Sequence, residues 1–331
     1  MGLPEQTNPP AERITVAVPT YNRAPLLDRA LAALEAQDMD PAGWAALVID
    51  NNSTDGTVEI VQRYLARGRL PGLRYLSEPR QGLSFCRLRA VRESRTGLIA
   101  FVDDDCFLDP DWLRKAVEFC DLHPEAGAVG GRVDLLWEDS PPEEALRYSR
   151  ALAQQDQGDE PCRLPQTGLT WLVGAGLVLQ REALERSGWC DRWIMVGRKG
   201  RELSGGSDVE IVLRIRHAGF ELWYNPAMHL VHYLPPHRGT IQYICRLNRE
   251  QASALPVLGM LAAGRIPSLP KRVKSFALRA VALGSICNEI ATHDFLARRR
   301  GPSTERRILF CQALGHMLGA FRALFVRAGF L

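Results

Sequence analysis

The alternation of strand-like and helix-like segments between residues 14 and 102 is the feature that most constrains the fold of this chain. Strand-like runs occur at residues 14–18, 45–49, 73–76 and 98–102, and the first of them is β-branched, which suits a buried parallel strand. The segments between them, at residues 25–37, 57–67 and 84–94, read as helices. Such alternation is typical of a parallel sheet with helices on both faces. The sequence therefore predicts an α/β fold with a mostly parallel, Rossmann-like sheet.

Polar clusters follow three of the predicted strands. Thr20–Arg23 follow the first strand, Asp50–Ser53 the second, and Asp103, Asp104 and Asp105 the fourth. In parallel sheets these positions meet at one edge, where ligands bind. A lone Asp at a strand end often only forms a turn. Three adjacent carboxylates, however, repel one another and are costly to bury unless a cation or hydrogen-bond donors compensate them. The cluster thus favours a divalent-cation site over a structural turn.

The remainder of the chain is less regular. Residues 140–166 read as a loop or partly helical insertion, and residues 170–179 as a strand. That strand contains Gly174-Ala-Gly176, which lacks the third glycine of a dinucleotide-binding fingerprint. An amphipathic helix is predicted at residues 207–218, and a final strand at 221–224 leads to Asn225-Pro226 and to His229, His232 and His237.

Charge is distributed unevenly along the chain. The net charge is +3, but residues 264–331 hold twelve Arg and Lys against three Asp and Glu, so this tail carries +9 and the rest −6. The overall charge does not indicate nucleic-acid binding, whereas the basic tail suggests an anionic surface as a partner. Its apolar stripe, Phe310, Leu314, Met317, Phe321 and Leu324, fits either docking on the main domain or insertion into a membrane interface.

The cysteines and the N-terminus bear on location. The eight cysteines form no CxxC pair and no zinc-type spacing, which is typical of reduced thiols in a cytosolic protein. The first thirteen residues lack the apolar core of a signal peptide, and no run of 18 apolar residues occurs. We expect a cytoplasmic protein, peripheral at most on the inner face of the cytoplasmic membrane.

Five motifs, taken in order, resemble the family 2 glycosyltransferases with the GT-A fold. They are VAVPTYNR (16–23), VIDNNSTDGT (48–57), GLSFCRLRA (82–90), AFVDDDCFLDPDWL (100–113) and GGSDVEIVLRIRHAGFELWYNP (205–226). The resemblance implies a GT-A domain at residues 13–238, with a nucleotide-binding half at 13–135 and an acceptor half at 167–238. Residues 1–12 are expected to be disordered, and residues 239–331 to form a basic helical extension.

The resemblance also implies a chemistry. Members of this family move a sugar from a nucleotide-diphosphate donor to an acceptor hydroxyl, usually with inversion and with Mn²⁺ or Mg²⁺. A UDP-sugar is favoured here because Asp50 matches an aspartate that would accept a hydrogen bond from the base. The acceptor would belong to a polysaccharide, a glycolipid or another glycoconjugate. By the same resemblance the metal ligands are Asp103, Asp105 and His232, and the nucleotide-sugar contacts are Pro19, Thr20, Tyr21, Arg23, Asp50, Asn52, Gly82, Arg87, Asp103 and Asp104.

Asp208 matches the family's general base, which removes the acceptor proton. Ser207 stands where the family commonly has Glu, which affects the expected acceptor contacts more than the chemistry. A purely structural alternative is that Asp208 caps the helix that follows it.

Two other functions compete with glycosyl transfer. A sugar-phosphate nucleotidyltransferase would share the sheet and the acidic ligands, but usually has a Gly-rich, basic loop after the first strand, where this chain has PTYNRAP. A catalytically inactive nucleotide-sugar-binding protein is the other alternative, and the presence of Asp208 beside the three aspartates argues against it.

Overall fold

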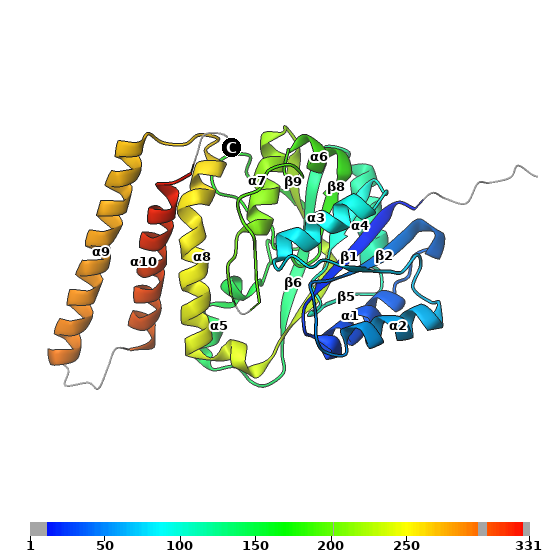
Figure 1. The fold of residues 1–331 in the computed structure, drawn as a ribbon, viewed down its shortest axis with the longest axis horizontal. Coiled ribbons are helices and arrows are strands. Elements are labelled where there is room, and N and C mark those ends of the chain that lie inside the picture. Colours follow the sequence, from blue (N-terminus) through cyan, green and yellow to red (C-terminus); the bar gives the residue numbers. More distant parts are fainter. Residues whose placement is uncertain (1–11, 201, 297–302, 327–331) are drawn as a thin grey trace, which may run out of the picture.

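The first third of the chain forms a parallel sheet layered with helices, as the computed structural model shows for the described residues 12–200, 202–296 and 303–326 (Figure 1). All but one residue of the segment expected to be disordered, 1–12, lies outside these ranges. Strand β1 pairs in parallel with β2 and β4, and β2 with β3. The elements are β1 Ile14–Thr20, α1 Ala24–Glu35, β2 Trp44–Asp50, α2 Thr57–Arg67, β3 Arg74–Ser77, α3 Leu83–Glu93 and β4 Leu98–Phe101.

The second part of the domain extends the same sheet with mixed pairing. The strand order is β3-β2-β1-β4-β8-β6-β9-β5, and β7 pairs with β9. Strand β8 runs antiparallel to β4 and β6, whereas β6 and β9 are parallel. The elements are β5 Cys106–Leu108, α4 Trp112–Leu122, β6 Ala126–Trp137, α5 Glu143–Leu146, β7 Cys162–Arg163, β8 Leu177–Gln180, α6 Arg181–Arg186, α7 Ser207–His217 and β9 Glu221–Leu234.

Two predicted strands differ from the structure. The strand expected at residues 170–179 is only Leu177–Gln180, because residues 170–176 follow an irregular path in which Leu172 and Ala175 are nevertheless buried. The strand expected at 221–224 continues to Leu234. Its pairing with β6 shifts register after Asn225, so Pro226 falls in an irregularity where its missing N–H breaks no ladder bond.

Helices cover both faces of the sheet, as predicted, because successive strand residues point to opposite sides. Val16 and Val18 pack in one core with α1, α2 and α4. Ala17, Leu47 and Ile49 pack on the other side with α3, α6 and α7. Since both faces are buried, β1 and β2 are mostly apolar, and the polar side chains that could meet a ligand gather at their carboxyl ends.

Three long helices form the C-terminal extension: α8 Ile241–Ala262, α9 Leu269–Leu296 and α10 Thr304–Ala323. They stand side by side at one end of the molecule, with α8 nearest the sheet and α9 outermost (Figure 1). Helix α8 packs on Leu213 of α7 through Ala254, Leu258 and Leu261. Helix α10 packs on α8 so closely that a Cβ on Gly319 would lie 2.2 Å from the Ser253 carbonyl oxygen. The extension is thus joined to the domain through α8 and also through α10, whose Glu305 pairs with Arg147 at 2.7 Å.

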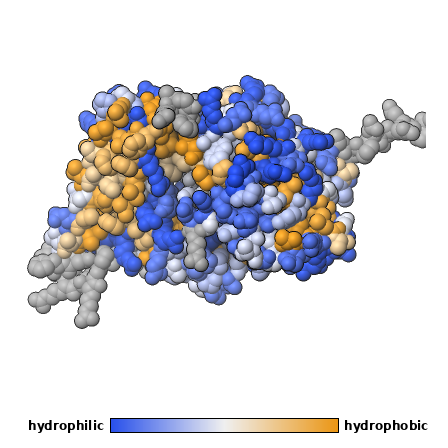
Figure 2. Space-filling model, viewed as in Figure 1, coloured by the Kyte–Doolittle hydropathy of each residue, from blue (hydrophilic) through white to orange (hydrophobic). Residues whose placement is uncertain are grey.

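The closest approach of α10 to α8 is made by glycines, Gly315 and Gly319, and not by the predicted apolar stripe. The stripe residues themselves are half-buried or exposed. Phe321 of the stripe meets Phe276 of α9, with ring centroids 5.8 Å apart. Figure 2 shows apolar surface gathered over this end of the molecule. None of the helices in the described ranges has the length and hydropathy needed to span a membrane.

Candidate active site

One cavity of about 480 Å³ opens at the carboxyl edge of the parallel strands. The structure brings together ten of the thirteen residues that the sequence assigned to a site, and α8 closes one side of the cavity. The ten lining residues are Pro19, Thr20, Tyr21, Arg23, Arg87, Asp103, Asp104, Asp105, Asp208 and His232. Asp50, Asn52 and Gly82 are not among the residues that line it.

The three aspartates occupy different environments. Asp104 is buried, and its carboxylate accepts hydrogen bonds from Thr20 Oγ1 at 2.8 Å and Arg23 Nη1 at 2.9 Å. Burial raises the pKa of Asp104 to about 6, against the attraction of Arg23. Asp103 is half-buried and lines the cavity, so it is the most accessible of the three. Asp104 is therefore held by the protein, and Asp103 is better placed to meet a ligand.

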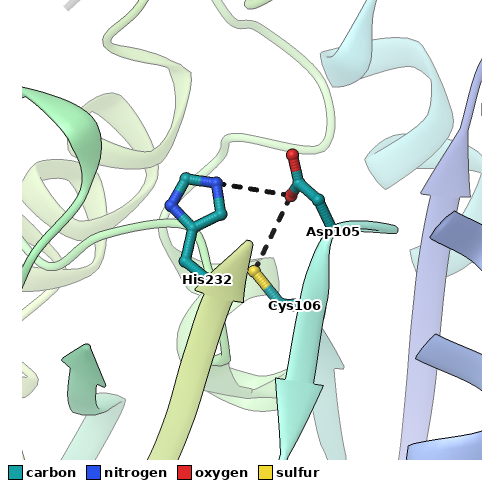
Figure 3. Close-up of side chains that lie close together, drawn as sticks. All are labelled: Asp105, Cys106 and His232. Carbon is teal, nitrogen blue, oxygen red and sulfur yellow. Dashed lines mark hydrogen bonds and ion pairs between the residues drawn. The ribbon is translucent and has the colours of Figure 1, made fainter. Parts of the chain in front are cut away.

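Asp105 is compensated by two arginines. Its Oδ2 accepts from Arg23 Nη1 at 2.9 Å and from Arg238 Nη2 at 2.8 Å. Burial alone would raise the pKa of Asp105, but the Arg238 guanidinium holds it well below its ordinary value. His232 of β9 faces Asp105, with Nε2 at 3.5 Å from Oδ1 (Figure 3). The repulsion predicted for the cluster is thus relieved by guanidinium groups that lie far away in the sequence.

The residues around Asp105 fit a divalent cation. Asp105 offers a carboxylate oxygen and His232 an imidazole nitrogen, a donor set that suits Mn²⁺. Cys106 Sγ lies near both (Figure 3), but burial raises the pKa of this thiol well above its ordinary value, so it stays protonated at neutral pH. His229, which pairs with Asp109 and Asp134, belongs to another cluster.

Asp50 is buried behind the cavity. Its carboxylate accepts from Tyr75 Oη at 2.6 Å and from the Ser53 N–H at 2.9 Å, and only 2% of the residue is exposed. Its neighbour Asn51 lines the cavity instead. Asn51 Oδ1 accepts from the Gly82 N–H, which fixes the turn into α3. Gly82 has φ +141°, and a side chain there would collide with Val196.

Asp208 projects from the first turn of α7. The N-cap is Gly206, so the capping role considered for Asp208 is wrong. Asp208 Oδ2 accepts a hydrogen bond from the Gly174 N–H at 2.9 Å, and Asp208 Oδ1 accepts one from the N–H of Val209, the next residue of the helix. The half-buried carboxylate lines the cavity and faces the same space as the acidic cluster. The arrangement gives a fixed carboxylate that can accept a proton from a bound hydroxyl group.

Arg87 is buried and lines the cavity. Its Nη1 donates to Ser207 Oγ at 3.2 Å, and its guanidinium lies 5.2 Å from the centre of the Phe101 ring. A Cβ on Gly174 would lie 2.4 Å from Arg87 Nη2. Ser207, which replaces the usual Glu, therefore helps to hold Arg87, and Gly174 provides the room for it.

Three residues that position the site were missed from the sequence. Arg238 carried no local signal, because its partner Asp105 is 133 residues away. Gly174 was considered only for dinucleotide binding. Glu210, one helical turn into α7, is buried and accepts hydrogen bonds from the Ile194 and Met195 N–H groups. Its position in the amphipathic helix, on the buried face, was the signal that could have revealed it.

A family model described as Glycosyl transferase family 2 matches residues 15–186, more than half of the chain. The chain belongs to glycosyltransferase family 2. Glycosyltransferase AglE of Haloferax volcanii is 30% identical over 125 residues, which cover 38% of this chain and 40% of that protein. Poly(ribitol-phosphate) beta-N-acetylglucosaminyltransferase TarS of Staphylococcus aureus is 28% identical over 148 residues, 42% of this chain and 26% of TarS. The matches thus span less than half the length of these relatives.

Solved structures share the fold of this family 2 chain. Mannosyltransferase PcManGT from Pyrobaculum calidifontis, in complex with GDP-Man and Mn²⁺, has a TM-score of 0.57 at 23% identity, covering 98% of this chain and 91% of that one. TarS 1–349 in complex with UDP-GlcNAc has a TM-score of 0.51 at 17% identity, covering 72% and 65%. The architecture is therefore the GT-A fold, as the sequence predicted.

Proposed function

We propose that this protein transfers a sugar from a nucleotide-diphosphate donor to an acceptor hydroxyl, with inversion and with the help of a divalent cation. The observation that carries the proposal is that one cavity is lined both by Asp208 and by the acidic cluster with His232. Inverting transfer needs both elements: a base for the acceptor and positive charge near the leaving group.

The donor side is built from the residues that follow β1 and β4 and from His232 of β9. Asp103, Asp105 and His232 would hold Mn²⁺ or Mg²⁺, which stabilises the negative charge on a departing nucleoside diphosphate when bound. Arg23 adds a guanidinium at the same edge. Solved relatives bind UDP-GlcNAc and GDP-Man. The direct contact of Asp50 with the base, on which the preference for a UDP-sugar rested, is not available in this structure, because Asp50 is buried against Tyr75 and does not line the cavity. The nucleotide of the donor is therefore left to the donor panel below.

Part of the cavity lining is apolar and would meet the acceptor. Trp171, with 53% of its surface exposed, and Leu169 lie on the irregular segment before β8 and line the cavity. Helix α8 adds Leu255 and Leu258 to the same wall. A flat aromatic ring and aliphatic side chains suit the face of a sugar or a lipid chain better than a charged acceptor. The acceptor we propose is a glycolipid, or a growing glycan carried on a lipid.

A donor panel tests the proposal. With Mn²⁺ present, one class among UDP-, GDP- and dTDP-sugars is expected to raise the melting temperature of the purified protein, because a ligand that binds only the folded state stabilises it. The same donor should be hydrolysed slowly to its nucleoside diphosphate. Release of pyrophosphate from a nucleoside triphosphate and a sugar phosphate would instead identify a nucleotidyltransferase. Donor binding without hydrolysis or transfer to any acceptor would identify a binding protein.

We further propose that the helical extension binds an anionic membrane surface. Leu278 and Val281 of α9 are 60% and 68% exposed, and Phe325, just past α10, is 69% exposed. Lys271 and Lys274 of α9 are exposed as well, so apolar and cationic side chains are exposed on the same helix, at the end of the molecule where Figure 2 shows apolar surface. This combination is typical of helices that lie in a bilayer interface and are attracted to anionic lipids.

Flotation with vesicles tests this partner. The full chain is expected to float with vesicles that contain phosphatidylglycerol at low salt, and less so at high salt, because salt screens charge. The double change Leu278→Glu and Val281→Glu should abolish flotation, whereas Leu122→Glu, on the 77% exposed Leu122 of α4, is the matched control and should not. Equal flotation of both variants, or none for the wild type, would contradict the proposal.

A further inference from the structure

Arg238 contacts both groups expected to ligate the metal. It lies in the 3-10 turn Pro236–Gly239 between β9 and α8, and 3% of the residue is exposed. Its Nη2 donates to Asp105 Oδ2 at 2.8 Å and its Nη1 to His232 Nε2 at 2.9 Å. One buried guanidinium therefore joins the carboxylate to the imidazole.

The hydrogen bonds of His232 fix its tautomer. Nδ1 lies 3.0 Å from the Leu152 carbonyl oxygen, which can only accept, so the proton is on Nδ1. Arg238 can only donate, so Nε2 presents its lone pair to the guanidinium. This is the tautomer of a histidine that ligates a metal through Nε2, with a carbonyl supporting the other nitrogen.

A neutral imidazole has one lone pair at Nε2, and here that lone pair accepts the hydrogen bond from Arg238. This hydrogen bond must therefore break before the imidazole can ligate an ion. Asp105 is different, because a carboxylate has about four acceptor sites and can serve several partners at once. Arg23 illustrates this, since it shares Asp105 Oδ2 with Arg238. Arg238 and a metal ion therefore compete for His232, but not for Asp105.

We propose that Arg238 is an exchangeable internal counter-ion of the metal site. Its guanidinium compensates Asp105 and covers His232 Nε2, and it leaves His232 when the imidazole takes a divalent cation. The inference rests on the proposed function, in which the site holds such a cation beside a diphosphate. The diphosphate brings the negative charge that a displaced guanidinium needs, so metal and nucleotide favour each other's binding.

The alternative is that Arg238 only clamps the turn before α8 to β5. The two roles predict different effects of Arg238→Met, which removes the charge and keeps an apolar chain of similar reach. An exchangeable counter-ion competes with the metal, so its loss strengthens metal binding. A clamp does not compete, so its loss lowers the melting temperature and leaves the affinity for metal unchanged.

Electron paramagnetic resonance titration of Mn²⁺, without donor or acceptor, makes the test. We expect Arg238→Met to bind Mn²⁺ about tenfold more tightly than the wild type, and the gain that added nucleoside diphosphate brings to be smaller than in the wild type. In EDTA, the melting temperature of Arg238→Met should be lower than that of the wild type. Added Mn²⁺ should raise the melting temperature of Arg238→Met more than it raises that of the wild type. If Arg238→Met does not fold in EDTA, Arg238→Lys, which cannot bond both groups in the same way, should show the same trend.

Arg23→Met is the matched control. It removes the other guanidinium from Asp105 but leaves His232 Nε2 bonded to Arg238, so a smaller gain in Mn²⁺ affinity is expected. Equal gains in Arg23→Met and Arg238→Met, or no gain in Arg238→Met, would overturn the proposal. The Mn²⁺ titration contains no donor, so a result that overturns the role of Arg238 does not bear on the proposed sugar transfer. Conversely, a failure of the donor panel would contradict the proposed transfer without altering the measured Mn²⁺ affinities.

Discussion

Asp208→Asn is expected to lower the rate of transfer roughly 10²-fold to 10⁴-fold, the range for loss of a general base. The amide cannot take the acceptor proton, but its oxygen can still accept a hydrogen bond from the Gly174 N–H. Donor affinity should change little, because in the proposed site Asp103, Asp105 and Arg23 hold the donor and all three are unchanged in this variant. Turnover, donor affinity and melting temperature should be measured on one preparation.

Asp156→Asn supplies the control for the structural part of this change. Asp156 is exposed, lies outside the cavity lining, and accepts a hydrogen bond from the backbone N–H of Gly158, as Asp208 does from Gly174. It should retain the wild-type rate. A normal turnover number for Asp208→Asn would exclude Asp208 as the base, whatever its effect on the melting temperature.

Asp105→Ala is expected to abolish Mn²⁺-dependent nucleotide binding and transfer. The sequence alone suggested that the fold would tolerate this change, since it relieves repulsion among carboxylates. The structure indicates otherwise, because Arg238 would keep its charge in a buried position without its partner. Removing one member of a buried ion pair typically costs about 3–5 kcal/mol. Calorimetry with UDP and Mn²⁺, alongside thermal unfolding, would report both effects.

A double variant separates the lost metal site from the lost stability. Asp105→Ala combined with Arg238→Met removes both charges, so much of the melting temperature should return. Mn²⁺-dependent nucleotide binding should remain absent, because the carboxylate ligand is still missing. Nucleotide affinity in Asp105→Ala equal to that of the wild type, or wild-type affinity unaffected by EDTA, would contradict the assignment of Asp105 to the metal.

The local parts of the fold could be predicted from sequence. Helix α2, predicted at residues 57–67, is found as Thr57–Arg67, because its apolar face and the glycines that flank it, Gly56 and Gly68, define both ends. The run at residues 170–176 misled the prediction because buried apolar residues need not form a strand. Here they line a cavity, and their backbone bonds go to side chains such as Asp208.

The sequence predicted where most residues of the candidate site lie, but not which side chains they bond to. Strand ends locate Thr20 and the aspartates, since parallel topology brings these ends together. Which partner each aspartate takes depends on segments far apart in the sequence. Tyr75 covers Asp50, Thr20 binds Asp104, and Arg238 binds Asp105. Pattern and spacing within one segment contain no information about such pairs.

The close contact of α10 with α8 has a consequence for how the cavity is oriented. Gly315 and Gly319 bring the α10 backbone against α8, and the opposite side of α8 supplies Leu255 and Leu258 to the cavity. Helix α8 therefore lines the cavity and also packs against the helices that we propose to bind the membrane. A bilayer bound by those helices would lie at a fixed distance and tilt relative to Asp208. The distance between the membrane and the hydroxyl that reacts on a lipid-linked acceptor would then be set by the structure of the protein.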